Sequence, residues 1–347
     1  MRSTIIRIGL GALLGFLPLT GATAADMTPH EAALYEAAKK EGKLTWYVAQ
    51  YSTKDSEKIA QSFSARYPGV SANVIRTTGQ VAYARLLQDL KAGVAECGVF
   101  TGTDIGHYFA LKANGKLLQY KPENAAKLRK PYLDLDPDGY YFTSSANPTV
   151  IIYNTKLVQA ANAPKNWPDL TDPKWTNKLA LSHPGFSGST GSWALLMQKL
   201  YGKDFFEKLK KLNPLIGRSL LDPPNTLNAG ERAVGISSLT TATELKLKGN
   251  PIEIVYPTDG VKLTLSATGI LANAPTPNAS KLFAEYLLSV ENSRTFVKQG
   301  GQPLRPEVDP PAGVLAIDDM KVAPLTEKEV AAGVPDVIET WRDVFGN

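Results

Sequence analysis

The sequence predicts an α/β protein with two domains, and three observations support this prediction. In the first third of the chain, a strand-like segment is followed by a helix-like segment three times, which is typical of a parallel sheet wound with helices. A length of 347 residues suits two domains better than one. Each of these strands ends in a loop of small polar residues, and open α/β sheets bind ligands at such strand ends.

The N-terminal half contains the clearest elements. Thr28, Pro29 and Glu31 predict a capped first helix, which Gly42 ends. Apolar periodicity then predicts strands and helices in alternation. We expect strands at 43–49, 70–75 and 97–100, helices at 54–67 and 81–91, and a further helix ending at 114–115.

The alternation resumes after a long β-type run at 148–155, which is flanked by loops rich in Pro and Asp. Short apolar runs then predict strands, and longer periodic segments predict helices. We expect strands at 179–182, 230–238 and 252–256, with an extended run at 263–271. The expected helices end near 201 and cover 204–212, 241–248, 278–299 and about 337–345.

A loop rich in Gly, Ser and Thr, at 183–193, separates the strand at 179–182 from the next helix. The unpaired N–H groups and the dipole of a helix N-terminus favour an anion there, and glycines let the backbone approach it closely. The loop residues expected to hold an anionic group are Ser187, Gly188, Ser189 and Thr190. The alternative is an ordinary helix N-cap in which the glycines serve only the turn.

The first residues predict export. Arg2 and Arg7 precede an apolar run at 8–17 and an Ala-x-Ala sequence at 22–24, which are the three parts of a secretory signal peptide. The apolar run is too short to cross a bilayer as a helix. We therefore expect residues 1–24 to be a cleaved signal peptide and the mature protein to be periplasmic.

Composition and motif spacing argue against several function classes. The net charge is only +5, without a dense block of Lys or Arg, so nucleic acid is not an expected partner. The single Cys97 excludes an internal disulfide. Ser189 stands where the nucleophile elbow Gly-x-Ser-x-Gly needs its second glycine. The three histidines form no zinc-type pair, so we expect no metal, no cofactor and no catalytic group.

Four segments carry a family resemblance, and they lie at 150–158, 230–236, 257–261 and 284–288. Their order and spacing resemble the bacterial extracellular solute-binding proteins of ABC importers. The ferric-ion-binding branch is the most similar, since the second and third segments resemble its Gly-Glu-x-x-x-Gly strand and Pro-x-x-Gly turn. The resemblance implies the type 2 periplasmic binding fold, in which two lobes with mixed, mostly parallel sheets and flanking helices are joined by hinge crossover strands.

The chain departs from that branch where a metal would bind. Ferric binders have two adjacent tyrosines after the Gly-Glu strand, whereas residues 237–241 here are Ser, Ser, Leu, Thr and Thr. Because Fe(III) requires anionic oxygen ligands, we expect no tight iron binding. Relatives in the branch bind sugar phosphates and phosphonates, so the resemblance implies a small organic anion, either a phosphate ester, a phosphonate or a carboxylate.

The ligand is expected in a cleft between the lobes, because a ligand that bridges both lobes favours their closure on the hinge. Chain order suggests lobe 1 at 26–145 plus 265–305 and lobe 2 at 146–264 plus 306–347. Asp259 is a candidate for a ligand hydroxyl or amine, and so is Glu244, for which a surface charge is the favoured interpretation. The expected ligand-binding residues are Tyr51, Ser52, Arg76, Thr77, Thr78, Gly79, Thr103, His183, Ser187, Gly188, Ser189, Thr190 and Asp259.

The expected partner is the permease of an ABC importer in the inner membrane, which would receive the ligand from a monomeric binding protein without enzymatic activity. Three alternatives stay open at this stage. The first is a ferric-ion-binding transport protein, and the second is a subunit that reports ligand binding to a membrane receptor. The third, less favoured, is a secreted hydrolase on a similar scaffold.

Overall fold

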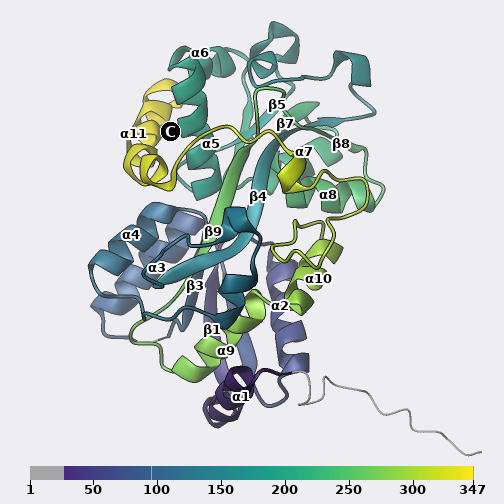
Figure 1. The fold of residues 1–347 in the computed structure, drawn as a ribbon. Coiled ribbons are helices and arrows are strands. Elements are labelled where there is room, and N and C mark those ends of the chain that lie inside the picture. The colour runs from purple at the N-terminus through teal and green to yellow at the C-terminus, as the bar shows by residue number, and fades with distance from the viewer. Residues whose placement is uncertain (1–26, 95, 347) are drawn as a thin grey trace, which may run out of the picture.

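The computed structural model describes residues 27–94 and 96–346, which form two lobes around one continuous sheet (Figure 1). Within this part of the chain the sheet has nine strands, in the order β2-β1-β3-β9-β4-β7-β5-β6, with β8 also paired to β4. The expected signal peptide lies outside the described residues. The strands are β1 (Lys43–Val48), β2 (Ser71–Arg76), β3 (Val99–Gly102), β4 (Tyr141–Asn154), β5 (Leu179–Ser182), β6 (Leu215–Gly217), β7 (Val234–Ser238), β8 (Ile252–Val255) and β9 (Lys262–Ile270).

Two long antiparallel strands, β4 and β9, run through both lobes. Their pairing extends from Tyr141 opposite Gly269 to Thr149 opposite Lys262, and the register shifts once, next to Thr143. Strands β2, β1 and β3 extend the sheet in lobe 1, while β7, β5 and β6 extend it in lobe 2. The predicted two-lobed α/β fold with crossover strands is therefore confirmed, and the exact lobe boundaries stay a prediction.

Helices cover both faces of the sheet (Figure 1). In lobe 1, α2 packs against β2, while α1 and α9 pack against each other. In lobe 2, α5 and α6 pack against each other and against the C-terminal helix α11. The helices are α1 (Pro29–Glu41), α2 (Thr53–Arg66), α3 (Gly79–Lys91), α4 (Ile105–Ala113), α5 (Gly188–Tyr201), α6 (Asp204–Lys211), α7 (Asp222–Asn228), α8 (Leu239–Leu247), α9 (Pro277–Leu287), α10 (Val290–Lys298) and α11 (Glu327–Phe345).

The single helix expected at 278–299 is wrong, because the structure has two helices there. The first, α9, ends at Leu287, and α10 begins at Val290. The side chain of Ser289 accepts a hydrogen bond from the backbone N–H of Asn292, which gives α10 an N-cap of its own.

The C-terminal helix is also longer than expected. It begins at Glu327 because Thr326 and Glu329 form a capping box, whereas Gly333 and Pro335 disfavour helix in the sequence. Its buried residues Val330, Val334, Val337, Trp341 and Val344 form one apolar stripe. Packing of this stripe on α5, α6 and α4 overrides the weak local preference.

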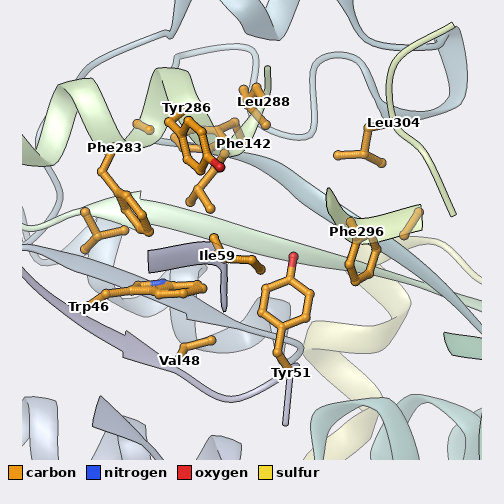
Figure 2. Packing of buried hydrophobic residues seen from close by; sticks show 14 of the residues in the cluster. Trp46, Val48, Tyr51, Ile59, Phe142, Phe283, Tyr286, Leu288, Phe296 and Leu304 are labelled. Carbon is orange, nitrogen blue, oxygen red and sulfur yellow. The ribbon is translucent and has the colours of Figure 1, made fainter. Parts of the chain in front are cut away.

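The largest apolar core lies on one face of the sheet in lobe 1 and continues into lobe 2. Figure 2 shows the ring of Tyr51 between those of Trp46 and Phe296, with ring centroids 6.0 Å and 5.2 Å away. Phe283 of α9 packs on the Trp46 ring with its centroid at 5.0 Å. These contacts hold the end of β1 and the loop after it in place.

A lysine is buried on the hinge strand. Lys262, the first residue of β9, is 2% exposed, and its ammonium group donates a hydrogen bond to the Leu263 carbonyl. Burial lowers the pKa of Lys262 to about 8, and the nearby Glu327 carboxylate opposes this shift. Burial raises the pKa of Glu327. At neutral pH the buried positive charge of Lys262 therefore destabilises the folded state.

The Lys262→Met variant tests this charge through the pH dependence of stability. The unfolded lysine keeps its proton up to a pKa of about 10.4, whereas the folded one loses it near pH 8. Between these values the unfolded state binds more protons, so the wild-type protein gains stability as pH rises. We expect the stability of wild type relative to the variant to increase by about 2 kcal/mol from pH 7 to pH 10, measured by urea unfolding. A difference independent of pH would contradict this.

Candidate functional site

The carboxyl ends of strands from both lobes meet in the region between the lobes. Strand β9 runs from lobe 2 into lobe 1, and β3 is antiparallel to it, so β3 and its parallel neighbours β1 and β2 end toward lobe 2. Strand β4 runs the opposite way, and β7 is antiparallel to it, so β7, β5 and β6 end toward lobe 1. The loops predicted to hold ligand are therefore brought together.

The glycine-rich loop touches lobe 1 very closely. A Cβ atom on Gly188 would lie 2.6 Å from the backbone of both Thr103 and Asp104, which is too close for any side chain. Gly79 at the start of α3 lies against the same loop, and its Cβ would be 3.9 Å from the carbonyl oxygen of Phe186. At this point the two lobes are in direct backbone contact.

The hydroxyl groups of Ser187 and Thr190, which were expected to hold an anion in this loop, make hydrogen bonds inside lobe 2. Ser187 Oγ caps α5 by accepting the N–H of Thr190, and Thr190 Oγ1 lies 2.7 Å from Ser182 Oγ. The carbonyl of Ser189 accepts the hydroxyl of Ser192. The helix-capping alternative therefore describes Ser187 and Thr190 in this structure.

His183 belongs to the internal structure of the same loop. Its side chain is 7% exposed, and its Nδ1 accepts the N–H of Gly185 at 2.9 Å. Its ring packs edge-on against Trp341 of α11, at 6.0 Å between centroids. His183 thus connects the glycine-rich loop to the C-terminal helix.

Asp259 lies apart from the other predicted residues. Its Oδ2 accepts the hydroxyl of Tyr201 at 2.5 Å and the backbone N–H of Trp167 at 3.0 Å. The indole of Trp167 also donates to the carbonyl of Gly260. Asp259 therefore anchors a turn within lobe 2, and the structure does not bring it to the strand ends between the lobes.

Tyr51, Ser52 and Arg76 are brought together, as predicted. Arg76 Nε donates to the Tyr51 carbonyl at 2.9 Å, and Ser52 caps α2. The Tyr51 hydroxyl lies beside Ser145 of β4 and Gln50, and burial raises the Tyr51 pKa to about 12. The end of β1, the end of β2 and strand β4 therefore meet at one place.

Arg76 has no hydrogen-bonded carboxylate partner at this place within the described chain. Burial lowers the pKa of Arg76, and the negative charge of Asp222 in lobe 2 opposes this shift. Asp222 instead accepts the backbone N–H groups of Arg218 and Ser219, at 2.7 and 2.9 Å. No carboxylate among the residues the structure describes lies within ion-pair distance of Arg76. A half-buried guanidinium without a carboxylate partner favours an anionic ligand.

Several side chains on the adjoining elements have buried polar atoms without a hydrogen-bond partner in the described chain. Thr77 donates its N–H to the Val48 carbonyl, but the hydroxyl of Thr78 has no partner in the described chain. Strand β4 and helix α8 contribute as well, since the N–H of Thr240 donates to Asn147. Further buried side chains with an unpaired polar atom on the β1 loop, α2, β4, α8, β9 and the end of α10 are Gln50, Asp55, Thr149, Thr240, Thr243, Ser266 and Gln299.

Most of these residues were not predicted from the sequence. The rule that ligands lie at strand ends points to 237–241 after β7, but these residues were considered only as the position of absent tyrosines. Asp55 was hidden because it occupies the third helical position, where an acidic residue is expected for capping. Gln299 had no signal, since only the break between α9 and α10 and the turn at Gly300 place it beside α2.

The described residues contain no group of three or more His, Cys, Asp or Glu side chains that could hold a metal ion. None of the helices built from them is long and apolar enough to cross a membrane.

Comparisons with known proteins agree with this fold. Residues 99–317 match the family model described as bacterial extracellular solute-binding protein. A putative 2-aminoethylphosphonate-binding periplasmic protein of Salmonella typhimurium is 24% identical over 322 residues, covering 88% of this chain and 89% of its own. Iron uptake protein A2 of Synechocystis sp. is 25% identical over 252 residues, covering 67% of this chain and 69% of its own.

Solved structures show the same fold at low identity. The periplasmic binding protein AfuA from Actinobacillus pleuropneumoniae, with fructose-6-phosphate bound, has a TM-score of 0.79 at 21% identity and covers 88% of this chain and 99% of its own. Iron-bound HitA from Pseudomonas aeruginosa has a TM-score of 0.74 at 20% identity, covering 87% and 99%. At these identities the likeness concerns the fold.

The Gly188→Ala variant tests the close contact between the lobes. Because the added methyl group would meet the Thr103–Asp104 backbone at 2.6 Å, the lobes must shift apart. We expect a loss of about 1–3 kcal/mol in the free energy of unfolding and a larger radius of gyration by X-ray scattering.

The matched control is Gly79→Ala at the same interface, where the nearest atoms would lie at 3.9 and 4.0 Å. This variant should be within about 1 kcal/mol of wild type and can be slightly more stable, because alanine restricts the unfolded chain. Equal stability of the Gly188 variant and wild type would show that this contact does not hold the lobes together.

Proposed function

Because the chain belongs to the bacterial extracellular solute-binding proteins, we propose that it captures a small organic anion between its lobes for uptake by an ABC importer. The observation that carries this proposal is Arg76. Its guanidinium group is half-buried where the lobes meet and has no carboxylate partner among the described residues. A phosphate ester, a phosphonate or a carboxylate supplies the missing charge.

The site around Arg76 suits a small polar ligand body. Uncharged side chains on the adjoining loops, those of Gln50, Thr78 and Thr240, have buried polar atoms without a hydrogen-bond partner in the described chain. A buried polar atom left unpaired costs about 1–3 kcal/mol, and a ligand that pairs with it recovers this energy. Specific hydrogen bonds would thus select the ligand body while Arg76 selects its charge.

The transport mechanism follows from the hinge. Arg76 and Gln50 belong to lobe 1, Thr240 belongs to lobe 2, and strands β4 and β9 connect the lobes. A ligand that contacts both sides binds the closed form more tightly than the open one and shifts the population toward it. The closed form would then dock on a permease in the inner membrane.

The same proposal assigns the protein to the periplasm as a monomeric binding component, not an enzyme. Relatives with comparable sequences are named as periplasmic binding or uptake proteins. The N-terminal residues, with their charged, apolar and Ala-x-Ala parts, support export.

Native mass spectrometry of the protein taken directly from the periplasm tests the proposed ligand class. We expect a mass excess that disappears on denaturation and releases a small acidic molecule. An excess that matches ferric ion would contradict the anion proposal and favour the iron-transport alternative.

Substitution of Arg76 by Gln tests the residue that carries the proposal. Hydrogen bonds to charged groups contribute about 1.5–3 kcal/mol, so the variant should bind the recovered anion about 10- to 100-fold more weakly by calorimetry. Arg342→Gln is the control, since this exposed arginine of α11 pairs with Glu339. If the Arg76 variant keeps wild-type affinity, Arg76 does not bind the anion.

A further inference from the structure

A second buried charged group of lobe 1, opposite in sign to Arg76, follows the same loop after β1. Asp55, in the first turn of α2, is 6% exposed, and burial raises its pKa. Its Oδ2 accepts the hydroxyl of Ser52 at 2.6 Å, while its Oδ1 has no hydrogen-bond partner in the described chain. Arg76 bonds the neighbouring Tyr51 carbonyl, so both charges flank the same short turn.

Helix capping does not account for this carboxylate. Ser52 caps α2 by accepting the N–H of Asp55, and one carboxylate oxygen accepts the serine hydroxyl in return. The cap therefore uses Oδ2 alone. A buried carboxylate oxygen without a donor is costly, and its cost indicates a purpose other than the cap.

Two further unpaired acceptor atoms belong to the end of α10, which contacts α2, and to helix α8. Gln299, at the end of α10, donates its amide N–H to the Asp55 carbonyl at 3.4 Å, and its Oε1 has no partner in the described chain. The adjacent Gly300 packs on α8 of lobe 2, where its Cβ would lie 3.1 Å from the Cβ of Thr243. The Thr243 hydroxyl is also buried and unpaired. Asp55 and Gln299 therefore meet α8 at the contact between the lobes.

The unpaired acceptor atoms of this cluster suit a cation, and the charged side chains around it are of both signs. Glu244 of α8 acts on Asp55 as a second negative charge, while the positive charges of Lys58 and Lys248 oppose it. Lys248 already pairs with Glu244, and both lysines are exposed, whereas Asp55 and Gln299 are buried. The cluster offers too few anionic ligands for a hard metal ion. An ammonium group has three N–H donors, which matches three unpaired acceptors.

We propose that Asp55, Gln299 and Thr243 form an ammonium subsite, so that the ligand is a small zwitterion with its anionic end at Arg76. The inference rests on the proposed capture of an anion and specifies the ligand class further. The acceptors come from both lobes, so the ammonium group would contribute to closure as well as to selection. Anions that lack the amine would bind through Arg76 alone.

Calorimetry with two matched pairs of probes tests this inference on the mature protein. The pairs are 2-aminoethylphosphonate with ethylphosphonate, and 4-aminobutyrate with butyrate, in which the members differ only by the amine. We expect wild type to bind the better amine-bearing probe at least 10-fold more tightly than its partner. Asp55→Asn should remove this preference and leave the affinity for the amine-free anion within about twofold.

Two variants distinguish the subsite from a general structural effect. Asp259→Asn is the matched control, because Asp259 also has one unpaired buried oxygen but lies within lobe 2. This variant should bind both members of each pair with wild-type affinity. Thr243→Val keeps the shape of the side chain, does not touch the α2 cap, and should weaken only the amine-bearing probe, by several-fold.

The outcomes separate this inference from the proposed function. Equal binding of both members of a pair by wild type would reject the ammonium subsite and leave anion capture standing. Equal weakening of both members by Asp55→Asn would reject it too, because that result indicates a structural role for Asp55. If no probe of either pair binds and the anion recovered from the periplasm carries no amine, the ammonium subsite is rejected and anion capture stands.

Discussion

The antiparallel pair formed by β4 and β9 is the constraint on which the rest of this structure depends. Both strands pass through the two lobes, so they set the direction of every strand beside them. As a result, the carboxyl ends of β1, β2 and β3 point at those of β5, β6 and β7. Loops that are far apart along the chain, such as those at Gly188 and Thr103, meet only because of this arrangement.

The contact between the lobes has two different sides. On one side α11 packs on α4 and α5, and Gly106 and Gly191 allow Ala331 and Val334 to approach. On the other side, α2, α8 and the end of α10 meet through polar groups, several of them unpaired within the described chain. Apolar packing holds lobes together regardless of ligand, whereas unpaired polar groups favour closure only when something bonds to them.

Sequence reasoning identified part of the candidate site for a sound physical reason. Polar residues after a parallel strand lie at a predictable edge of the sheet, and this placed Tyr51, Ser52 and Arg76 correctly beside one another. At Asp259 the structure shows a further role, because Tyr201 and Trp167 bond its carboxylate, and its part in ligand binding stays a prediction. Sequence reasoning failed to separate a helix cap from an anion cradle at Ser187, since both use the same residue types.

The sequence by itself determined the alternation of strands and helices, the two-lobed fold class and the family, because these depend on periodicity and order along the chain. Only the tertiary structure decided which polar groups are left without partners. Asp55 and Gln299 are separated by most of the chain, and their contact depends on how α10 packs against α2. The burial of a polar group and its hydrogen bonds depend on that packing. The chemistry of the site can therefore be inferred only from the packed lobes.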